Sequence, residues 1–284
     1  MNAKKVNRPV KPTGERLTEY HRGLITLEHL HRYALACQLA ADKSVLDLAC
    51  GEGYGSQLLA NVARAVTGAD IDKETITAAR QKYNQANLNF VTCTATDLPF
   101  ADNSFDLVVS FETLEHLEEH SKMLAEIKRV LRPAGIVLIS TPDKKNYSDK
   151  TGYRNPYHLK ELYRSEFQHL LTEFFQNTKL YNQYSGLYSV CCSEDSNDSP
   201  LVYNGTIEKL AAPESGSSPY IIALASDSDL TVLPTSLFEE TGLLQQLLLD
   251  HANDVRRTMS YRLGHFLLSP AKWIYSFFRT KENG

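Results

Sequence analysis

Three acid–base side chains follow one short, largely apolar segment of the sequence. Residues 105–111 have the pattern of a buried strand, and Glu112, Glu115 and His116 come shortly after it. In open α/β sheets the reacting groups gather at the carboxyl ends of the strands. Histidine is the side chain best suited to accept a proton near neutral pH. We therefore predict that His116 is a general base, with Glu112 and Glu115 nearby to orient it. A histidine that only caps or packs the start of a helix is the alternative.

A second histidine, His158, ends a long segment of turn-forming residues. Residues 141–158 are rich in Pro, Gly, Asn and Asp and contain Tyr147, Tyr153 and Tyr157. A loop of this length inside a compact domain is usually functional, and this one follows a predicted strand on the ligand side. We predict that the loop forms part of a substrate pocket, with His158 as the second candidate base.

The segment before these residues is suited to holding a ligand. Residues 45–49 have the pattern of a short, fully buried parallel strand. The turn that follows carries almost no side-chain bulk at Gly51 and Gly53, so a ligand can approach the backbone closely. A predicted helix comes next, and strand, glycine turn and helix together form a nucleotide-binding corner. An ordinary buried strand and turn is the alternative.

The neighbouring residues indicate which nucleotide would bind. Ser56 stands where a dinucleotide fingerprint has its third glycine. Asp47 lies inside the strand, where a carboxylate would repel a diphosphate but would suit a positive group, such as the amino group of a methionine moiety. Asp70 ends the next predicted strand, where it can accept hydrogen bonds from ribose hydroxyls. The pattern therefore disfavours a dehydrogenase.

This corner resembles motif I of the Rossmann-like S-adenosylmethionine (SAM) methyltransferases, with Ala49 in place of the usual first glycine. The resemblance implies an enzyme that binds SAM and releases S-adenosylhomocysteine. It also implies that Ile71 packs on the adenine ring and that Arg32 meets the methionine carboxylate, a solvated salt bridge of Arg32 being the alternative. The cofactor residues implied in this way are Asp47, Ala49, Gly51, Gly53, Asp70, Ile71, Thr94, Ala95, Ser110 and Arg32.

One expected cofactor contact departs from the family pattern. The family usually carries an acid at the position of Thr94, where it binds the adenine amine. The hydroxyl of Thr94, the amide of Ala95 and the carboxylate of Asp97 are the candidate substitutes. The departure affects only the adenine contact.

Residues 14–190 resemble methyltransferases of bacterial surface-polysaccharide synthesis. Besides the glycine corner, the resemblance rests on residues 14–16, 28–33, 111–116 and 155–158. It implies O-methylation of a sugar or glycan-linked acceptor. Two alternatives share the cofactor residues, namely a small-molecule methyltransferase for a quinone or lipid, and a non-catalytic SAM-binding partner of glycosyltransferases.

The alternation of strand and helix patterns predicts a doubly wound α/β fold. We expect a mostly parallel seven-stranded sheet with an antiparallel last strand, helices on both faces, and a helical C-terminal extension. The expected strands are 45–49, 65–70, 88–93, 105–111, 136–140, and an antiparallel pair over 179–192 and 220–225. The expected helices are 23–41, 73–85, 121–131 and 159–175, with a turn at 132–135.

The chain is expected to have three parts. Residues 1–18 form a polar arm, residues 19–230 the methyltransferase domain with a mobile insertion at 193–219, and residues 236–284 an amphipathic helical extension. Basic and large apolar side chains alternate over residues 261–281. Packing of this extension on the domain or on a second subunit, as in a homo-oligomer, is favoured over contact with a membrane surface.

Composition and charge disfavour other classes of protein. A net charge of -4 at pH 7 argues against a nucleic-acid binder. The five cysteines lack metal-ligand spacing, and His29 and His31 would lie on different sides of a helix, so no metal site is expected. The basic N-terminus is followed by no apolar stretch, and no long apolar run occurs. We therefore expect a cytoplasmic protein, at most peripheral at the inner membrane.

Overall fold

The computed structural model describes residues 23–186, 204–205, 210–211, 218–239, 249 and 252–263. Their contacts divide the chain into two units, residues 1–238 and 239–284. The expected polar arm lies outside the described residues, as do most of the expected insertion and residues 264–284 of the expected extension. Within the second unit, residues 252–257 and 259–263 are helical.

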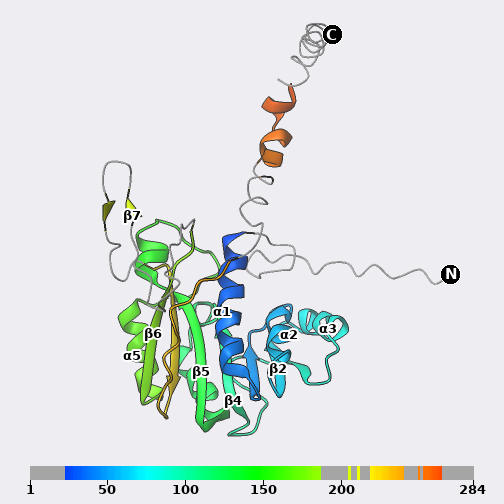
Figure 1. Ribbon diagram of the computed structural model, residues 1–284, viewed down its shortest axis with the longest axis vertical. Helices are drawn as coiled ribbons and strands as arrows, with labels where there is room; N and C mark the ends of the chain where they lie inside the picture. The colour runs from blue at the N-terminus through cyan, green and yellow to red at the C-terminus, as the bar shows by residue number, and fades with distance from the viewer. Residues whose placement is uncertain are drawn as a thin grey trace, which may run out of the picture. The chain divides into compact units, whose positions relative to one another are not determined.

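The first unit is built on a seven-stranded sheet of order β3-β2-β1-β4-β5-β9-β6 (Figure 1). Strands β1 to β5 pair in parallel, and β9 is antiparallel to both β5 and β6. The strands are β1 (Ser44–Leu48), β2 (Ala65–Asp70), β3 (Leu88–Thr92), β4 (Phe105–Phe111), β5 (Leu131–Pro142), β6 (Asn177–Gln183) and β9 (Tyr220–Ser226). A separate two-stranded pair consists of β7 (Asn204–Gly205) and β8 (Leu210–Ala211). The expected fold class is confirmed.

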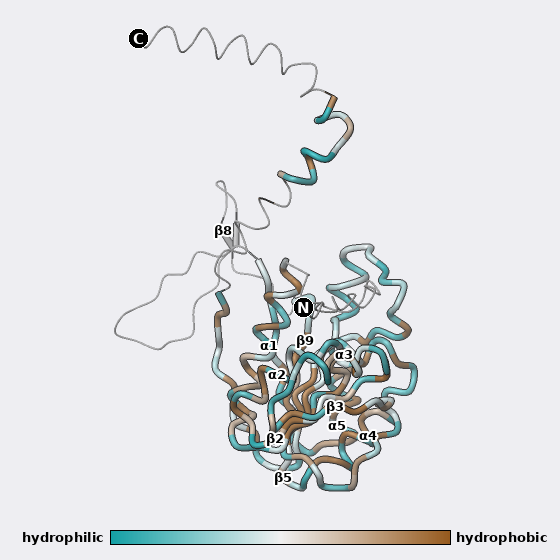
Figure 2. The backbone as a smooth tube through the Cα atoms, turned by 90° about the vertical axis from the view of Figure 1, so that its right-hand side faces the viewer, coloured by the Kyte–Doolittle hydropathy of each residue, from teal (hydrophilic) through white to brown (hydrophobic). Residues whose placement is uncertain are grey.

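Helices cover both faces of this sheet. Apolar side chains of α1 and α2 pack on one face, and those of α4 and α5 pack on the other. In Figure 2 the apolar strands accordingly lie in the middle of the unit. The helices are α1 (Leu24–Ala40), α2 (Tyr54–Ala60), α3 (Lys73–Lys82), α4 (His120–Val130) and α5 (Arg164–Phe174), with short helical turns η1 (Leu114–His116) and η2 (Lys145–Asp149).

The central strands explain why their sequences are almost continuously apolar. Val45 and Leu107 face the α1–α2 side, whereas the next residues, Leu46 and Val108, face the α4–α5 side. Successive side chains of a strand point to opposite faces, so a strand covered on both faces is apolar at most of its positions. Each such side chain contributes about 1.5–3 kcal/mol by leaving water.

The turn expected at residues 132–135 is instead a bulge inside β5. Phe105 pairs with Leu131 and Leu107 pairs with Ile136, so four residues of β5 lie opposite one residue of β4. The conformational preferences of proline and glycine in this segment distort the ladder without ending the strand.

Helix α5 begins five residues later than the expected helix, because the segment before it is tied to the region after β4. The backbone amides of Leu159 and Lys160 both donate to the carbonyl oxygen of Glu115, at 2.8 and 3.1 Å. The amide of Tyr163 donates to Oε2 of Glu166 at 2.9 Å, a hydrogen bond typical of a helix start. The loop before α5 is thereby anchored at the carboxyl end of β4.

The described residues include no helix that is long and apolar enough to cross a membrane. In the second unit, the apolar side chains of Val255, Met259 and Leu263 are exposed. The remaining residues of the basic and apolar segment expected at 261–281 lie outside the described part of the chain.

Candidate active site

A cavity of about 640 Å³ opens where β1, β2 and β4 end, a volume typical of small-molecule sites. Its wall combines α1, the glycine turn, the residues after β3 and β4, and the loop before α5. Among the predicted site residues, those in the wall are Arg32, Ala49, Gly51, Asp70, Ile71, Thr94, Ala95, Glu112, His116 and His158. Asp47, Gly53 and Ser110 do not line the cavity.

Asp47 lies beneath the glycine turn. Its carboxylate accepts hydrogen bonds from the hydroxyls of Ser56, at 2.6 Å, and Tyr33, at 3.2 Å. Burial raises the pKa of Asp47 to about 6, although these two hydroxyls oppose the shift. The visible role of Asp47 is therefore to join β1 to α1 and α2. Its predicted contact with a methionine amino group stays a prediction.

The glycine turn owes its shape to backbone conformations that favour glycine. Gly51 and Gly53 have φ angles of 54° and 81°. A Cβ on Gly53 would also come within 2.6 Å of the Phe90 ring. Ala49 has a φ of 62°, the same left-handed region, at the position where the family usually has glycine. The turn therefore places strain at one alanine.

We expect Ala49→Gly to stabilise the protein. The left-handed conformation costs a residue with a Cβ about 1–2 kcal/mol. Glycine loses about 0.5–1 kcal/mol of this gain through the entropy of the unfolded chain. The midpoint of denaturant unfolding should rise by the equivalent of about 0.5–1 kcal/mol. An unchanged or lower midpoint would contradict the strain at Ala49.

Asp70 holds the turn from the end of β2. Its Oδ2 accepts from the amide of Gly51 at 3.0 Å, and its Oδ1 accepts from the amide of Asp72 at 2.9 Å. The side chain is 6% exposed and lines the cavity. Each carboxylate oxygen can accept more than one hydrogen bond, as the predicted contact with ribose hydroxyls requires.

The residues predicted to surround adenine lie next to Asp70 in the cavity wall. Ile71 is 70% exposed, so its side chain is available to a flat ring. The hydroxyl of Thr94 lies 3.0 Å from the hydroxyl of Thr96. Thr94 and Ala95 line the cavity, whereas Asp97 does not. The three candidate substitutes for the missing acid are thus reduced to two by position.

Arg32 is buried, and the solvated salt bridge considered for it is wrong. It is 1% exposed, and its Nη1 lies 3.1 Å from Oε1 of Glu112. Nε donates to Gln183 at 2.7 Å, and the guanidinium lies 4.7 Å from the centre of the Tyr220 ring. Nη2 has no hydrogen-bond partner among the described residues. A buried guanidinium in the cavity wall whose Nη2 lacks a partner among the described residues is suited to an anionic group such as a carboxylate.

Glu112 contacts Ser140 and Arg32, and its predicted orientation of His116 stays a prediction. Its Oε1 accepts from the hydroxyl of Ser140 at 2.6 Å and faces Arg32. Its φ of 49° is strained for a residue with a side chain, and such strain tends to occur at functional sites. His116 is held by the carbonyl oxygen of Tyr157, which lies 3.0 Å from Nδ1.

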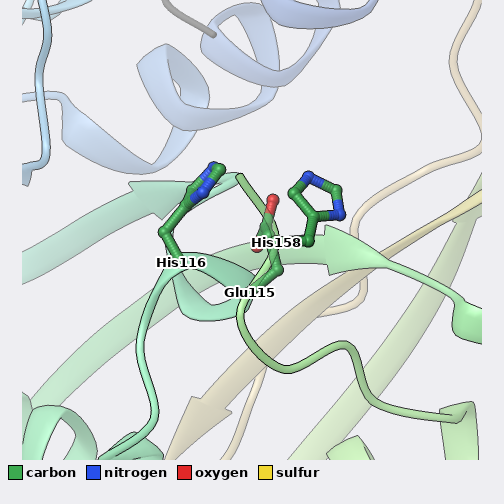
Figure 3. A group of neighbouring side chains, drawn as sticks. All are labelled: Glu115, His116 and His158. Carbon is green, nitrogen blue, oxygen red and sulfur yellow. The ribbon is translucent and has the colours of Figure 1, made fainter. Parts of the chain in front are cut away.

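His116 and His158 come together although 42 positions separate them. Their ring centres are 5.1 Å apart, and His158 also stacks on Tyr147 at 5.5 Å. Glu115 lies between them and is 1% exposed (Figure 3). We call this part of the wall, formed by Glu115, His116, His158, Tyr147 and Tyr157, the histidine side of the cavity.

Sequence reasoning missed several residues that shape the cavity. Tyr33 contacts Asp47 and packs edge-on against Phe111, with ring centres 5.2 Å apart. Tyr220 comes from β9, far along the chain, and faces Arg32. The sequence carried a signal for Ser56, because it replaces a fingerprint glycine. It placed Tyr33 in the segment 28–33 without indicating its contacts, and it carried no signal for Tyr220, because both positions depend on packing between distant elements.

The strand order, the glycine turn after β1 and the acid that ends β2 define a Rossmann-like methyltransferase fold. Residues 46–139 match the family described as "Methyltransferase domain". A "Probable S-adenosylmethionine-dependent methyltransferase" from Mycolicibacterium smegmatis is 38% identical over 140 residues, covering 49% of this chain and 54% of that protein. The ubiquinone/menaquinone biosynthesis C-methyltransferase UbiE of Desulfotalea psychrophila is 38% identical over 106 residues, 36% of this chain and 43% of that protein.

A chain in the solved complex that contains the Haloferax volcanii Trm112 methyltransferase activator has the same fold. Its TM-score is 0.53 at 19% identity, and the match covers 73% of this chain and 91% of that one. Residues 46–139 are thus similar to a methyltransferase domain, and the first of these relatives is described as SAM-dependent. The chain spans about half the length of the curated relatives it matches.

Proposed function

We propose that this chain transfers the methyl group of SAM to a hydroxyl oxygen of a sugar or glycan-linked acceptor in surface-polysaccharide synthesis. The observation that carries the proposal is one cavity lined by the glycine turn, by Asp70 and by the histidine side. Tyrosine rings, imidazoles and the amide of Asn155 share this wall. Such a mixture of hydrogen-bonding groups and ring faces suits an acceptor rich in hydroxyls.

The reaction would exchange one bond for another at the methyl carbon. The acceptor hydroxyl gives its proton to the imidazole of His116 or His158, and its oxygen forms a bond to the methyl carbon as the carbon–sulfur bond breaks. The electron pair of that bond stays on sulfur, which leaves as neutral S-adenosylhomocysteine. Holding the two reactants in line supplies up to about 7–11 kcal/mol, and help with the proton a further ~10²–10⁴-fold. We assign to His116 and His158 the role of accepting the proton of the acceptor hydroxyl. Glu112 would act by holding Arg32 beside them.

Two other functions compete with this one. A quinone or lipid acceptor would use the same cofactor residues, and the similarity to a quinone methyltransferase favours that candidate. A SAM-binding domain that docks on glycosyltransferases would need the glycine turn but no acceptor. Turnover with any acceptor would exclude this last candidate.

Mass spectrometry of surface glycans tests the acceptor class. Cells that make the chain should carry glycans heavier by one methyl group than cells that lack it. Cells complemented with the Asp70→Ala variant are the matched control, and their glycans should resemble those of the deletion. Unchanged glycans together with an altered quinone or lipid profile would contradict the sugar assignment and support the first alternative.

We expect Asp70→Ala to weaken SAM binding at least tenfold. The change removes the acceptor proposed for two ribose hydroxyls, and hydrogen bonds to a charged group contribute about 1.5–3 kcal/mol each. Titration calorimetry with SAM and S-adenosylhomocysteine measures the loss, and NAD should give no heat.

Asp72→Ala is the matched control for this measurement. Asp72 accepts from the amide of Thr75 at the start of α3, 2.9 Å away, and does not line the cavity. Losing this cap should cost about 0.5–2 kcal/mol of stability and leave SAM affinity within twofold. Unchanged SAM binding by a folded Asp70→Ala protein would refute the ribose role.

Contact of residues 236–284 with a membrane surface, a partner or a second subunit stays a prediction. The proposal of SAM-dependent methyl transfer does not depend on it, because the cavity wall lies within the first unit. The inner-membrane location suggested for the chain belongs to the same prediction.

A further inference from the structure

Three side chains with metal-binding atoms lie next to one another on the histidine side of the cavity (Figure 3). Glu115, His116 and His158 each offer one ligand atom, and these three atoms lie within 4.8 Å of one another. Ligands that share one ion at bonds of about 2.1 Å lie roughly 3–4 Å apart. A small movement of the loop that carries His158 would therefore bring all three atoms to one ion.

Hydrogen bonds set which nitrogen of each imidazole carries a proton. Nδ1 of His158 lies 2.6 Å from Oε1 of Glu161, so this nitrogen donates and Nε2 carries the lone pair. A carboxylate behind a histidine in this way is typical of metal sites, where it fixes the ring and makes it a stronger ligand. Nδ1 of His116 faces the carbonyl of Tyr157 and must also donate, which places the lone pair on Nε2.

Glu115 supplies a buried negative group that lacks a full set of partners. Its Oε2 accepts from the hydroxyl of Thr141 at 3.1 Å. Its Oε1 is buried and has no hydrogen-bond partner among the described residues. A bound cation would compensate the cost of burying the carboxylate.

We propose that Glu115, His116 and His158 bind one divalent transition-metal ion, with Glu161 holding the ring of His158. Two imidazoles and one carboxylate suit Zn²⁺, Mn²⁺, Fe²⁺, Co²⁺ or Ni²⁺, whereas Mg²⁺ and Ca²⁺ prefer oxygen ligands. The amide of Asn155, which lies 3.0 Å from Nε2 of His158, gives way to the ion. Three protein ligands leave coordination positions open to a substrate.

The role of the ion rests on the proposed methyl transfer, whereas its binding does not. An acceptor with two neighbouring oxygens, such as adjacent hydroxyls of a sugar ring, would fill two open positions. Coordination lowers the pKa of a bound hydroxyl, so that its proton passes to solvent before the oxygen attacks the methyl carbon. In this arrangement His116 activates the acceptor as a metal ligand instead of accepting the proton itself.

Titration of the metal-stripped full chain with Co²⁺ tests the site. Visible absorption of the bound ion should rise to one equivalent per chain, and Zn²⁺ should displace it. His116→Ala and His158→Ala should each weaken Co²⁺ binding at least about 100-fold, because each loses a ligand. Glu161→Gln should weaken it about 10–100-fold through the orientation of His158. His169→Ala is the control, because this histidine is exposed on α5 beside Glu173 and should leave binding unchanged.

Two results would overturn the proposal. One is a parent protein that binds none of Co²⁺, Mn²⁺ or Zn²⁺ at millimolar concentration. The other is Co²⁺ binding that survives in both histidine variants. Circular dichroism confirms folding, and His116→Gln and His158→Gln replace any alanine variant that unfolds. Calorimetry with SAM on the same samples separates the two proposals. If the protein binds SAM but no metal, only the metal proposal is refuted. If it does not bind SAM, the proposed function is refuted whatever the metal titration shows.

Discussion

Gly55→Ala should destabilise the protein, although alanine favours a helix and Gly55 lies in α2. A Cβ on Gly55 would come within 1.8 Å of Cζ and 2.3 Å of the hydroxyl oxygen of Tyr33. Tyr33 is buried between Phe111 and Tyr54, so it has little room to move. Overpacking costs about 1–3 kcal/mol. If Tyr33 also loses contact with Asp47, the buried carboxylate adds roughly 1–3 kcal/mol. Denaturant unfolding measures the sum, and SAM affinity should fall with it.

A Tyr33→Leu background provides the control for this prediction. Leucine lacks the ring atoms that the new Cβ would meet, so Gly55→Ala should cost much less there. It should even stabilise the variant by about 0.5–1 kcal/mol, as helix propensity alone predicts. An equal cost in both backgrounds would show that the contact between α1 and α2 is not the cause. A Gly55→Ala protein as stable as its parent would contradict the packing of Tyr33 itself.

Glu112→Ala should have the second large effect. The change leaves the buried guanidinium of Arg32 without the carboxylate that lies 3.1 Å from it. Removing one partner of a buried ion pair typically costs about 3–5 kcal/mol, because the remaining charge is uncompensated. Removing both charges, as in the pair Arg32→Met and Glu112→Ala, should recover part of the loss. Denaturant unfolding of the two single variants and the double variant measures both quantities.

Glu119→Ala is the matched control for Glu112→Ala. Glu119 is also an acid paired with a base, since it lies 3.7 Å from Lys122, but its side chain is 65% exposed. An exposed pair of this kind contributes about 0–1 kcal/mol. If Glu112→Ala costs no more than Glu119→Ala, then Arg32 is not held as a buried charge. A double variant less stable than Glu112→Ala would also contradict this account.

The sequence predicted the fold well because each central strand carries its own signal. The seven residues of β4 are apolar enough to require burial on both faces, and their bounds match the expectation. Segments whose structure depends on a partner were predicted less well. The preference of residues 132–135 for a turn is a local property. Whether these residues form a turn or a bulge depends on the pairing of β5 with β4. The start of α5 depends on hydrogen bonds from Leu159 and Lys160 to the carbonyl of Glu115. Helix propensity does not account for such a distant contact.

The site residues likewise include some that local sequence predicts and some that it does not. The glycine turn follows β1, and Asp70 ends β2, the neighbouring parallel strand. Their contact could therefore be predicted from the order of the strands. Ala49 departs from the family pattern, and its positive φ lies in the region that favours glycine. The burial of Arg32 and the meeting of His116 with His158 depend on contacts between segments far apart in the chain. Periodicity and spacing carry no information about such contacts.

Because β9 lies between β5 and β6 in the sheet but follows both in the sequence, the sheet can be completed only late in synthesis. Strands β5 and β6 end at Pro142 and Gln183, but β9, which lies between them, ends only at Ser226. A ribosome adds about 5–20 residues each second, so the interval from the end of β6 to the end of β9 lasts on the order of 2–9 s. During that time the apolar edge of β5 is open to wrong partners. A chaperone that protects nascent chains would therefore matter most in this interval, after the glycine turn has been translated and before β9 pairs with β5.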